Sequence, residues 1–245
     1  MLGLCLLYGP EPAERAIARC EELLAGAHGD QRSEAMLMNA LAQLYAMRAD
    51  FDRARSLYRR GRAALEDLGA KVQATAVSIY SGRVELLAGD PIAAEERMRP
   101  AYETFRMMGE RATCSTLAAI LGEAVFAQGR YDEAETLSRV SEEIASADDF
   151  DAQYRWRALR AKIRARSGAV SEAEATAREA VRIVQMSDSP VEQADALSAL
   201  AAVLRESARP TEAAPILAQA LQLYDAKGDL VSAKRIRAFT QPIVA

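Results

Sequence analysis

Adjacent acidic residues recur along this 245-residue sequence and are the first side chains to test for chemistry. The pairs are Glu21-Glu22, Glu95-Glu96, Glu142-Glu143 and Asp148-Asp149. Two carboxyl groups can serve as acid and base when they flank one bond. Neighbouring residues on a helix, however, point about 100° apart. These pairs therefore indicate solvated helix faces rather than a catalytic site.

Nucleophilic and metal-ligating side chains are few and scattered. The single histidine, His28, lies between glycines in a loop and has no Cys or His neighbour at metal spacing. Cys5, Cys20 and Cys114 each fall in an apolar stretch. The sequence contains no Gly-rich phosphate loop, Gly-x-Ser-x-Gly or His-Glu-x-x-His motif. We therefore expect no metal, no cofactor and no enzymatic activity.

The composition restricts partners and location. With 31 basic and 35 acidic residues the formal net charge is -4, so no basic field would attract a phosphate backbone, and we expect no direct nucleic-acid partner. An apolar run long enough to span a membrane is absent, and the first residues lack the basic start of a signal peptide. An odd number of scattered cysteines is typical of a reducing compartment. The sequence thus predicts a cytoplasmic protein that does not contact membranes.

A repeat of 39 to 40 residues runs through the whole chain and must position whatever polar groups act together. Small residues recur in three columns, each on one face of a helix. The first column contains Ala42, Gly82, Gly122, Ala161 and Ala201, the second Ala54, Ala94, Ala134, Ala173 and Ala213, and the third Gly61, Ala101, Ser141, Ala180 and Ala220. A short break precedes each member of the second column, so each unit is expected to be a helix hairpin stacked on the next.

Capping chemistry places the helix ends. Ser189-Pro190-Val191-Glu192 is a capping box with Pro at the first helical position, and glycines such as Gly69, Gly109 and Gly228 favour helix termination. The expected helices are 11–26, 31–48, 51–68, 71–88, 91–108, 111–128, 131–146, 151–167, 171–187, 190–207, 211–227 and 230–240. The last is interpreted as a C-terminal capping helix.

These columns resemble the tetratricopeptide repeat family, whose hairpins carry a small residue in the first helix, Gly or Ala at the turn, and then Ala, a large residue and a second small residue. One unit supplies Ala42, Tyr45, Ala54, Tyr58 and Gly61, and the next supplies Gly82, Gly89, Ala94, Met98 and Ala101. Two later units depart from this pattern, with Ser138 and Ala177 in place of the large residue. HEAT-type repeats overlap this period, but the Ala and Gly columns favour the tetratricopeptide interpretation.

The resemblance implies an all-α solenoid of about five to six helix hairpins, wound as a right-handed superhelix, in a single domain over residues 1–245. Phrases such as Ala127-Gln128-Gly129-Arg130-Tyr131-Asp132-Glu133-Ala134-Glu135 look like the C-terminal repeat region of large bacterial signalling proteins, in which an ATPase, a nucleotide cyclase or a DNA-binding domain accompanies the repeats. Projecting the period backward makes residues 1–8 the end of a truncated first hairpin. This apolar segment could pair two copies of the chain into a homodimer.

The resemblance also implies a concave groove lined by the first helix of each hairpin. The residues that follow the small first-helix positions, together with neighbouring rows, give the candidate groove residues Asn39, Gln43, Arg83, Glu123, Arg155, Lys162 and Arg205. A second interpretation is that alternating charges such as Arg83, Glu123 and Lys162 pair across adjacent hairpins and only keep the surface solvated. The family's two-Lys, Asn-rich clamp for a chain terminus is not evident.

Two functions remain open at this stage. The first is a non-catalytic interaction module that binds a peptide or a partner domain in the groove. The second is a ligand-sensing regulatory arm of a larger ATPase, cyclase or transcriptional regulator. A free-standing enzyme would require a convergent polar site, and no motif in the sequence supplies one.

Overall fold

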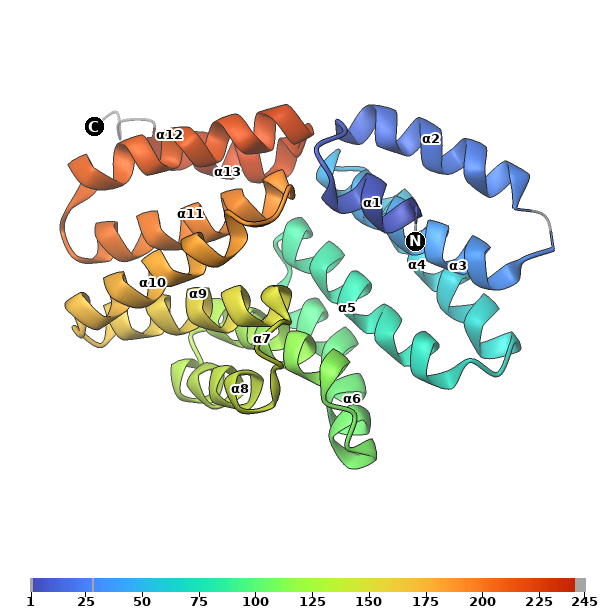
Figure 1. Ribbon diagram of the computed structural model, residues 1–245, viewed down its shortest axis with the longest axis horizontal. Coiled ribbons are helices and arrows are strands. Elements are labelled where there is room, and N and C mark those ends of the chain that lie inside the picture. Colours follow the sequence, from blue (N-terminus) through green and yellow to red (C-terminus); the bar gives the residue numbers. More distant parts are fainter. Residues whose placement is uncertain (1, 28, 241–245) are drawn as a thin grey trace.

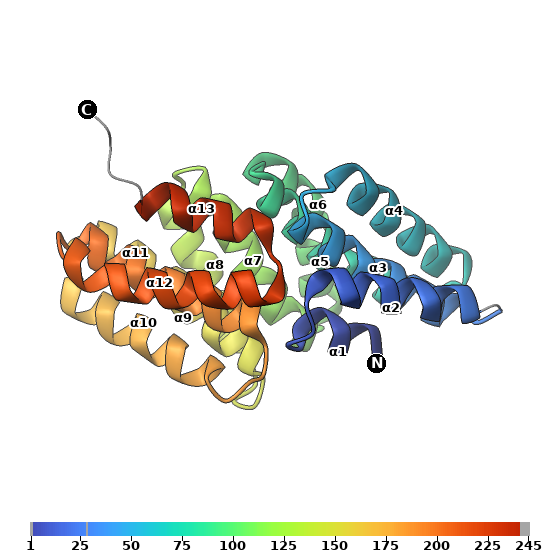
Figure 2. The ribbon, with the colours of Figure 1, turned by 90° about the horizontal axis from the view of Figure 1, so that it is seen from above.

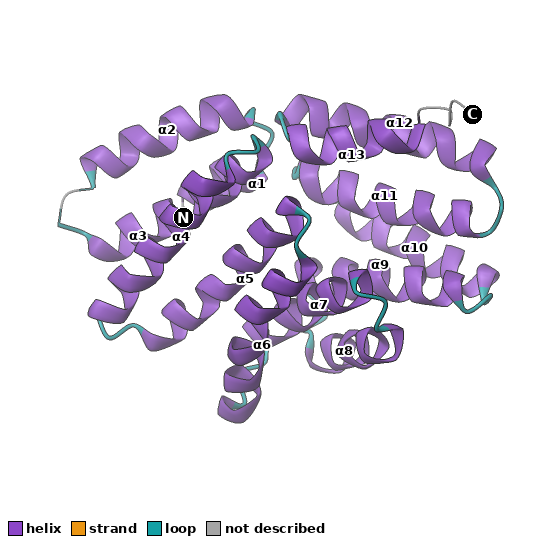
Figure 3. Ribbon diagram, turned by 180° about the vertical axis from the view of Figure 1, so that it is seen from behind, coloured by secondary structure: helices purple, strands orange, loops and turns teal. Residues whose placement is uncertain are grey.

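The computed structural model describes residues 2–27 and 29–240, and this part of the chain folds into thirteen helices without a strand (Figures 1 and 3). His28, which the sequence placed in a solvated loop, lies outside the described residues. The helices are α1 (Leu2–Tyr8), α2 (Ala13–Gly26), α3 (Gln31–Met47), α4 (Phe51–Asp67), α5 (Lys71–Ala88), α6 (Pro91–Met108), α7 (Ala112–Ala127), α8 (Tyr131–Ile144), α9 (Phe150–Arg166), α10 (Val170–Val184), α11 (Pro190–Glu206), α12 (Pro210–Lys227) and α13 (Leu230–Thr240).

Consecutive helices form the predicted hairpins, from α1–α2 to α11–α12, and the hairpins stack in chain order (Figure 1). The odd-numbered helices from α1 to α11 contact one another in sequence and form one layer, which we call the inner layer. The even-numbered helices pack against it as a second layer. The predicted all-α solenoid is confirmed. Among the described residues, no helix is long and apolar enough to cross a membrane.

The small-residue columns lie where helices approach most closely. Every member of the second column, Ala54, Ala94, Ala134, Ala173 and Ala213, has at most 1% of its surface exposed. A Cβ added at Gly122 would lie 2.5 Å from a terminal methyl carbon of Leu159, so the Leu159 side chain would have to shift at the α7–α9 contact. Close packing of this kind leaves little room for substitution, which explains why the columns repeat.

The two ends of the array meet (Figures 1 and 2). Buried apolar residues of the first two hairpins and of the helices from α9 to α13 belong to one continuous cluster, while residues around α6–α8 form a second. Helix α13 packs on α12 and also contacts α3, and its Arg235 donates from Nη2 to the carbonyl oxygens of Leu86 and Leu87 at 2.7 Å each. The helix expected to cap the C-terminal end therefore also bridges to the N-terminal half.

A fully buried ammonium group fastens this closure. Lys227, at the end of α12, donates from Nζ to the carbonyl oxygens of Leu6, Gly9 and Glu11 at 2.9, 2.7 and 2.9 Å. Burial lowers the pKa of Lys227 to about 8, while the Glu11 carboxylate opposes that shift. The three carbonyl oxygens satisfy all three donors of the ammonium group. The turn between α1 and α2 is thus tied to the last hairpin.

The turn inside each of the five hairpins from α3–α4 to α11–α12 has a left-handed backbone, which gives a direct test of the repeat geometry. Gly89, Gly129 and Gly168 occupy this position with φ between 80° and 83°, whereas Ala49 and Ala208 occupy it with φ of 66° and 57°. A left-handed residue with a Cβ is strained by about 1–2 kcal/mol. The two alanines therefore store strain that their glycine counterparts avoid.

We expect Ala208→Gly to raise the free energy of unfolding by up to about 1 kcal/mol, since relief of strain outweighs the greater entropy of the unfolded chain. Gly129→Ala should lower it by about 1 kcal/mol, because a Cβ there meets no atom within 4 Å and only the backbone angle opposes it. Urea unfolding followed by circular dichroism measures both. Changes of the same sign in the free energy of unfolding for both substitutions would contradict this account of the turn.

Candidate binding site on the inner helix layer

All seven predicted groove residues lie on the inner layer, but they do not form one continuous row. Asn39 and Gln43 belong to α3, Arg83 to α5, Glu123 to α7, Arg155 and Lys162 to α9, and Arg205 to α11. Four different environments result. The first holds α3 to its neighbours, the second pairs charges between α7 and α9, and the third gathers Arg83 and Arg155 with residues from other helices. The fourth places Arg205 against α13.

Asn39 and Gln43 are buried between helices, with 1% of each residue exposed. The Gln43 side chain donates from Nε2 to the carbonyl oxygen of Tyr80 at 2.6 Å and so joins α3 to α5. The Asn39 side chain faces Gly61 of α4, where an added Cβ would lie 2.9 Å from Asn39 Oδ1. In this state both side chains serve helix packing and are not accessible from the surface.

Glu123 and Lys162 form an ion pair across the α7–α9 contact. The Lys162 ammonium group also lies 5.3 Å from the centre of the Phe126 ring. This pair matches the interpretation in which charges alternate between adjacent hairpins and neutralise one another. Both side chains remain partly exposed, with 29% and 21% of their surface accessible, so a ligand could still compete for either group.

Arg83 of α5 contacts Tyr8, the last residue of α1. Its Nη1 donates to the Tyr8 hydroxyl at 3.0 Å, and its guanidinium group lies 5.6 Å from the centre of the Tyr8 ring. Burial raises the pKa of Tyr8, while the nearby Arg83 charge opposes that shift. Tyr8 comes from α1, and no repeat column contains it. Its role follows from the packing of α1 against α3 and α11.

Arg155 is held by α9 itself and reaches toward α11. Its Nε donates to Asp151 Oδ1 at 2.7 Å, and its guanidinium group lies 4.8 Å from the centre of the Tyr154 ring. Its Nη2 is 3.7 Å from Glu192 Oε1, beyond hydrogen-bond distance. The Arg155 side chain is 11% exposed and that of Glu192 only 3%.

Three polar atoms at this point are buried without a hydrogen-bond partner in the described structure: Arg155 Nη2, Glu192 Oε2 and the Tyr154 hydroxyl. A buried polar group without a partner costs about 1–3 kcal/mol. The nearby Asp195 is better satisfied, since Oδ1 accepts from the Tyr224 hydroxyl at 2.6 Å. We call Tyr8, Arg83, Asp151, Arg155, Glu192 and Asp195 the central polar cluster.

Burial dominates the electrostatics of the central polar cluster. It raises the pKa of Glu192 to about 7, while the Arg155 charge opposes the shift. Burial also raises the pKa of Asp195, against the hydrogen bond from Tyr224. A carboxyl group with such a pKa exchanges its proton near neutral pH, and clusters of perturbed groups are typical of functional sites. The cluster therefore combines a guanidinium donor with a carboxyl group that can donate or accept.

Arg205 lies elsewhere on α11 and is exposed. Its guanidinium group stacks 4.8 Å from the centre of the Phe239 ring of α13. The helix that closes the array thus covers one side of Arg205. Of the predicted groove residues, Arg83 and Arg155 belong to the central polar cluster, and Arg205 belongs to the α11–α13 contact.

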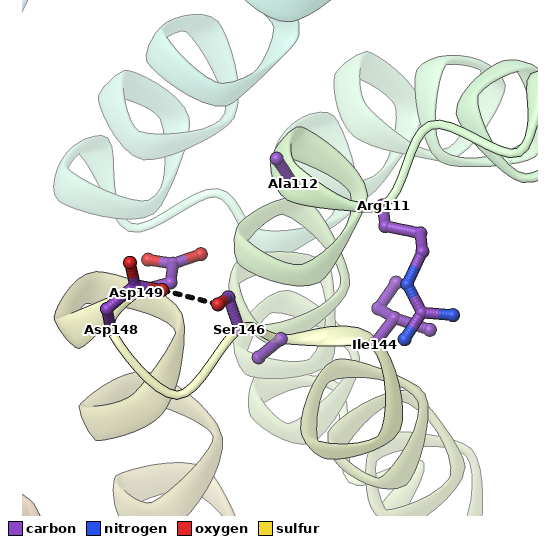
Figure 4. A pocket seen from close by; sticks show the side chains of 7 residues that line it. Arg111, Ala112, Ile144, Ser146, Asp148 and Asp149 are labelled. Carbon is purple, nitrogen blue, oxygen red and sulfur yellow. Dashed lines mark hydrogen bonds between the residues drawn. The ribbon is translucent and has the colours of Figure 1, made fainter.

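A separate surface pocket of about 580 Å³ lies where α7 begins and the α8–α9 connection passes (Figure 4). Its polar groups are engaged in holding helix ends. Asp149 accepts from the backbone N–H of Ala152 at 3.1 Å and so caps α9, and the Ser146 hydroxyl donates to Asp148. The Asp148-Asp149 pair therefore serves local structure, but it lies in the α8–α9 connection and not on the solvated helix face that the sequence indicated.

The described residues contain no group of three side chains that could hold a metal ion, and their cysteines are free. Cys5 is exposed on α1, whereas Cys20 and Cys114 are buried. Burial raises the pKa of the Cys20 thiol to about 11, which makes it a poor nucleophile at neutral pH.

Comparisons with known proteins agree with the hairpin architecture. The sequence profile of a tetratricopeptide repeat matches residues 193–224, which span most of α11 and α12. Among solved structures, NprR in complex with its cognate peptide NprX is similar with a TM-score of 0.64 and 13% identity, covering 94% of this chain and 68% of NprR. The chain folds as an α-solenoid similar to tetratricopeptide repeat proteins, and residues 193–224 match the repeat itself.

Two further structures share the fold of this solenoid. The apo form of the quorum sensor NprR from B. thuringiensis aligns with a TM-score of 0.58 and 14% identity, covering 93% of this chain and 67% of that one. BtubC from P. vanneervenii aligns with a TM-score of 0.55 and 18% identity, covering 95% and 92%. No curated protein matches the sequence. At these identities the likeness concerns the fold alone.

The raised pKa of Glu192 predicts a pH dependence of the solenoid's stability. The folded state keeps the proton up to a pH of about 7, and the unfolded state releases it near 4.5. Because the folded state binds more protons in this window, the free energy of unfolding falls as pH rises through it. Burial of Asp229, which raises its pKa to about 6, acts in the same direction, so the comparison must isolate Glu192.

We expect Glu192→Gln to flatten the decline in unfolding free energy across this window by roughly 2 kcal/mol relative to the unmodified chain. Glu206→Gln, an exposed position on the same helix, is the matched control and should leave the profile unchanged. Urea unfolding at several pH values gives all three curves. If the unfolding free energy of Glu192→Gln depends on pH in the same way as that of the unmodified chain, Glu192 is ionised in the folded state throughout this window.

Proposed function

We propose that this protein is a non-catalytic interaction module whose inner layer binds a peptide or a segment of a partner protein. A tetratricopeptide-like solenoid is typically a protein-interaction scaffold, which is the coarse function that the fold supports. The region that we assign to the ligand is the central polar cluster together with the Glu123–Lys162 pair. No reaction is assigned to it.

The observation that carries this proposal is the unpartnered donor and acceptor at Arg155 and Glu192. A peptide group has a carbonyl that accepts and an N–H that donates, and so do the side chains of Asn and Gln. Such a group placed beside Arg155 Nη2 and Glu192 Oε2 would satisfy both buried atoms at once. Removing two unsatisfied groups gives a ligand an energetic advantage that an exposed charged surface does not provide.

The similarity to NprR in complex with its cognate peptide adds support of a weaker kind, because it concerns the fold. It also favours a second candidate function, a ligand-sensing regulatory arm. The alignment covers about two thirds of the quorum sensor NprR, so part of that protein lies outside the matched region. A cytoplasmic location and pairing of two copies through residues 1–8 stay predictions.

Selection from a random-peptide phage library tests the proposed function, followed by calorimetric titration of the enriched synthetic peptides. We expect Arg83→Gln/Lys162→Gln to weaken binding by about tenfold or more, since each loses a charged donor to the ligand. The matched control is Arg62→Gln/Arg139→Gln on α4 and α8. It makes the same change in charge at exposed positions of the second layer, which the even-numbered helices form. Circular dichroism verifies that both variants remain helical.

Binding that the two double variants weaken equally would place the ligand away from the inner layer. Failure to enrich any peptide with the unmodified chain would count against peptide binding itself. Turnover of a small molecule by the purified chain would overturn the non-catalytic assignment. The three outcomes are distinct, so a negative result identifies which part of the proposal fails.

A further inference from the structure

The turn between α1 and α2 lies against the central polar cluster and is held there from outside its own hairpin. Lys227 binds the carbonyl oxygens of Leu6, Gly9 and Glu11, which bracket Tyr8 on both sides. The Tyr8 hydroxyl in turn accepts from Arg83. One buried ammonium group therefore determines where Tyr8 lies relative to the cluster.

The rest of α1 contributes few buried contacts. This helix has seven residues, and only Leu7 among them is buried, while Leu2 is 52% exposed and Cys5 is exposed. A helix of two turns is marginal by itself. The hydrogen bonds from Lys227 are consequently a large part of what fastens this segment, and the elements with the fewest buried contacts are those that open locally.

Two atoms of the central polar cluster are inaccessible in the closed state, although the Asp151 and Arg155 side chains as a whole are 27% and 11% exposed. Arg155 Nη2 and Glu192 Oε2 are both buried, although neither has a hydrogen-bond partner among the described residues. A ligand that satisfies them must first gain access. The segment that carries Tyr8 contacts α11, the helix of Glu192, and the charges of Arg155 and Glu192 act on the Tyr8 hydroxyl.

We propose that residues 2–11 form a lid held closed by Lys227, and that a peptide reaches Arg155 and Glu192 only after this lid has moved. The ligand class rests on the function proposed above, but the lid itself does not. In the closed state the lid acts as an internal ligand, with a tyrosine hydroxyl on Arg83 and backbone carbonyls on Lys227. An incoming peptide carries the same groups, since its carbonyls can replace those of residues 6, 9 and 11.

Hydrogen exchange read by mass spectrometry tests the lid without any ligand. Lys227→Met removes the donors but keeps an unbranched side chain of similar length. We expect the amides of residues 3–11 to exchange about tenfold faster or more, while those of α7 to α10 keep their protection. Lys234→Met, at an exposed position on α13, is the matched control and should change neither region. Unchanged exchange in residues 3–11 of Lys227→Met would overturn the lid.

A reversible lock gives a second test if Lys227→Met fails to fold. A Cβ built on Gly228 lies 3.8 Å from the Cβ of Ala13, which is the separation that a disulfide needs. Ala13→Cys/Gly228→Cys, combined with Cys5→Ser to remove the exposed thiol, can therefore tie the first hairpin to the last. The reduced form of the same protein is its own control, because both forms share the backbone strain at residue 228.

We expect oxidation to slow exchange in residues 3–11 and to reduce the association rate of a library-selected peptide by about tenfold, with reduction restoring both. Equal association rates in the two forms would overturn the gating role. If no peptide binds either form, the proposed function fails, and the exchange measurement still decides whether the lid exists. The two failures can therefore be told apart.

Discussion

The rest of the structure depends on one constraint: the two ends of the repeat array must meet. Apolar residues from the first two hairpins and from α9 to α13 share one core, so the first and last parts of the chain stabilise each other as the two sides of a domain do. Lys227 fixes their relative position at the turn between α1 and α2. A linear solenoid folds through contacts between neighbours, whereas this one adds contacts between residues more than two hundred positions apart.

Packing between helices brings the members of the central polar cluster together. Arg83 lies on α5, whereas Arg155 and Glu192 lie on α9 and α11, and exposed charges on separate helices are screened and hydrated. Here α1, α5, α9 and α11 bring them together with Tyr8, and burial raises the pKa of Glu192 to about 7. An apolar replacement of similar volume would stabilise such an interior as well or better. A ligand that completes the unpartnered donors and acceptors is the explanation that we propose for their burial.

Small residues make this geometry possible. Glycine or alanine at the first-helix position lets the odd-numbered helices approach one another, and at Gly122 even one added carbon atom would meet Leu159. The sequence predicted this role correctly from spacing alone, and the helix bounds agree with the predicted ones to within a few residues.

The groove was harder to predict. Asn39 and Gln43 occupy the expected repeat positions, yet both are buried between helices, because the curvature of the array, rather than the register of a repeat, decides which side chains stay accessible.

The sequence by itself determined the hairpin period, the helix ends and the tetratricopeptide-like fold. These features depend on interactions over a few residues, such as helix capping and the stacking of side chains on one face, and they recur in every unit. Only the tertiary structure decided that the array closes, that Tyr8 covers Arg83 and that Lys227 lies buried on the first turn. The physical reason is that small angles between successive hairpins add up over six units. No short stretch of sequence specifies the sum of these angles. That sum determines which distant residues meet.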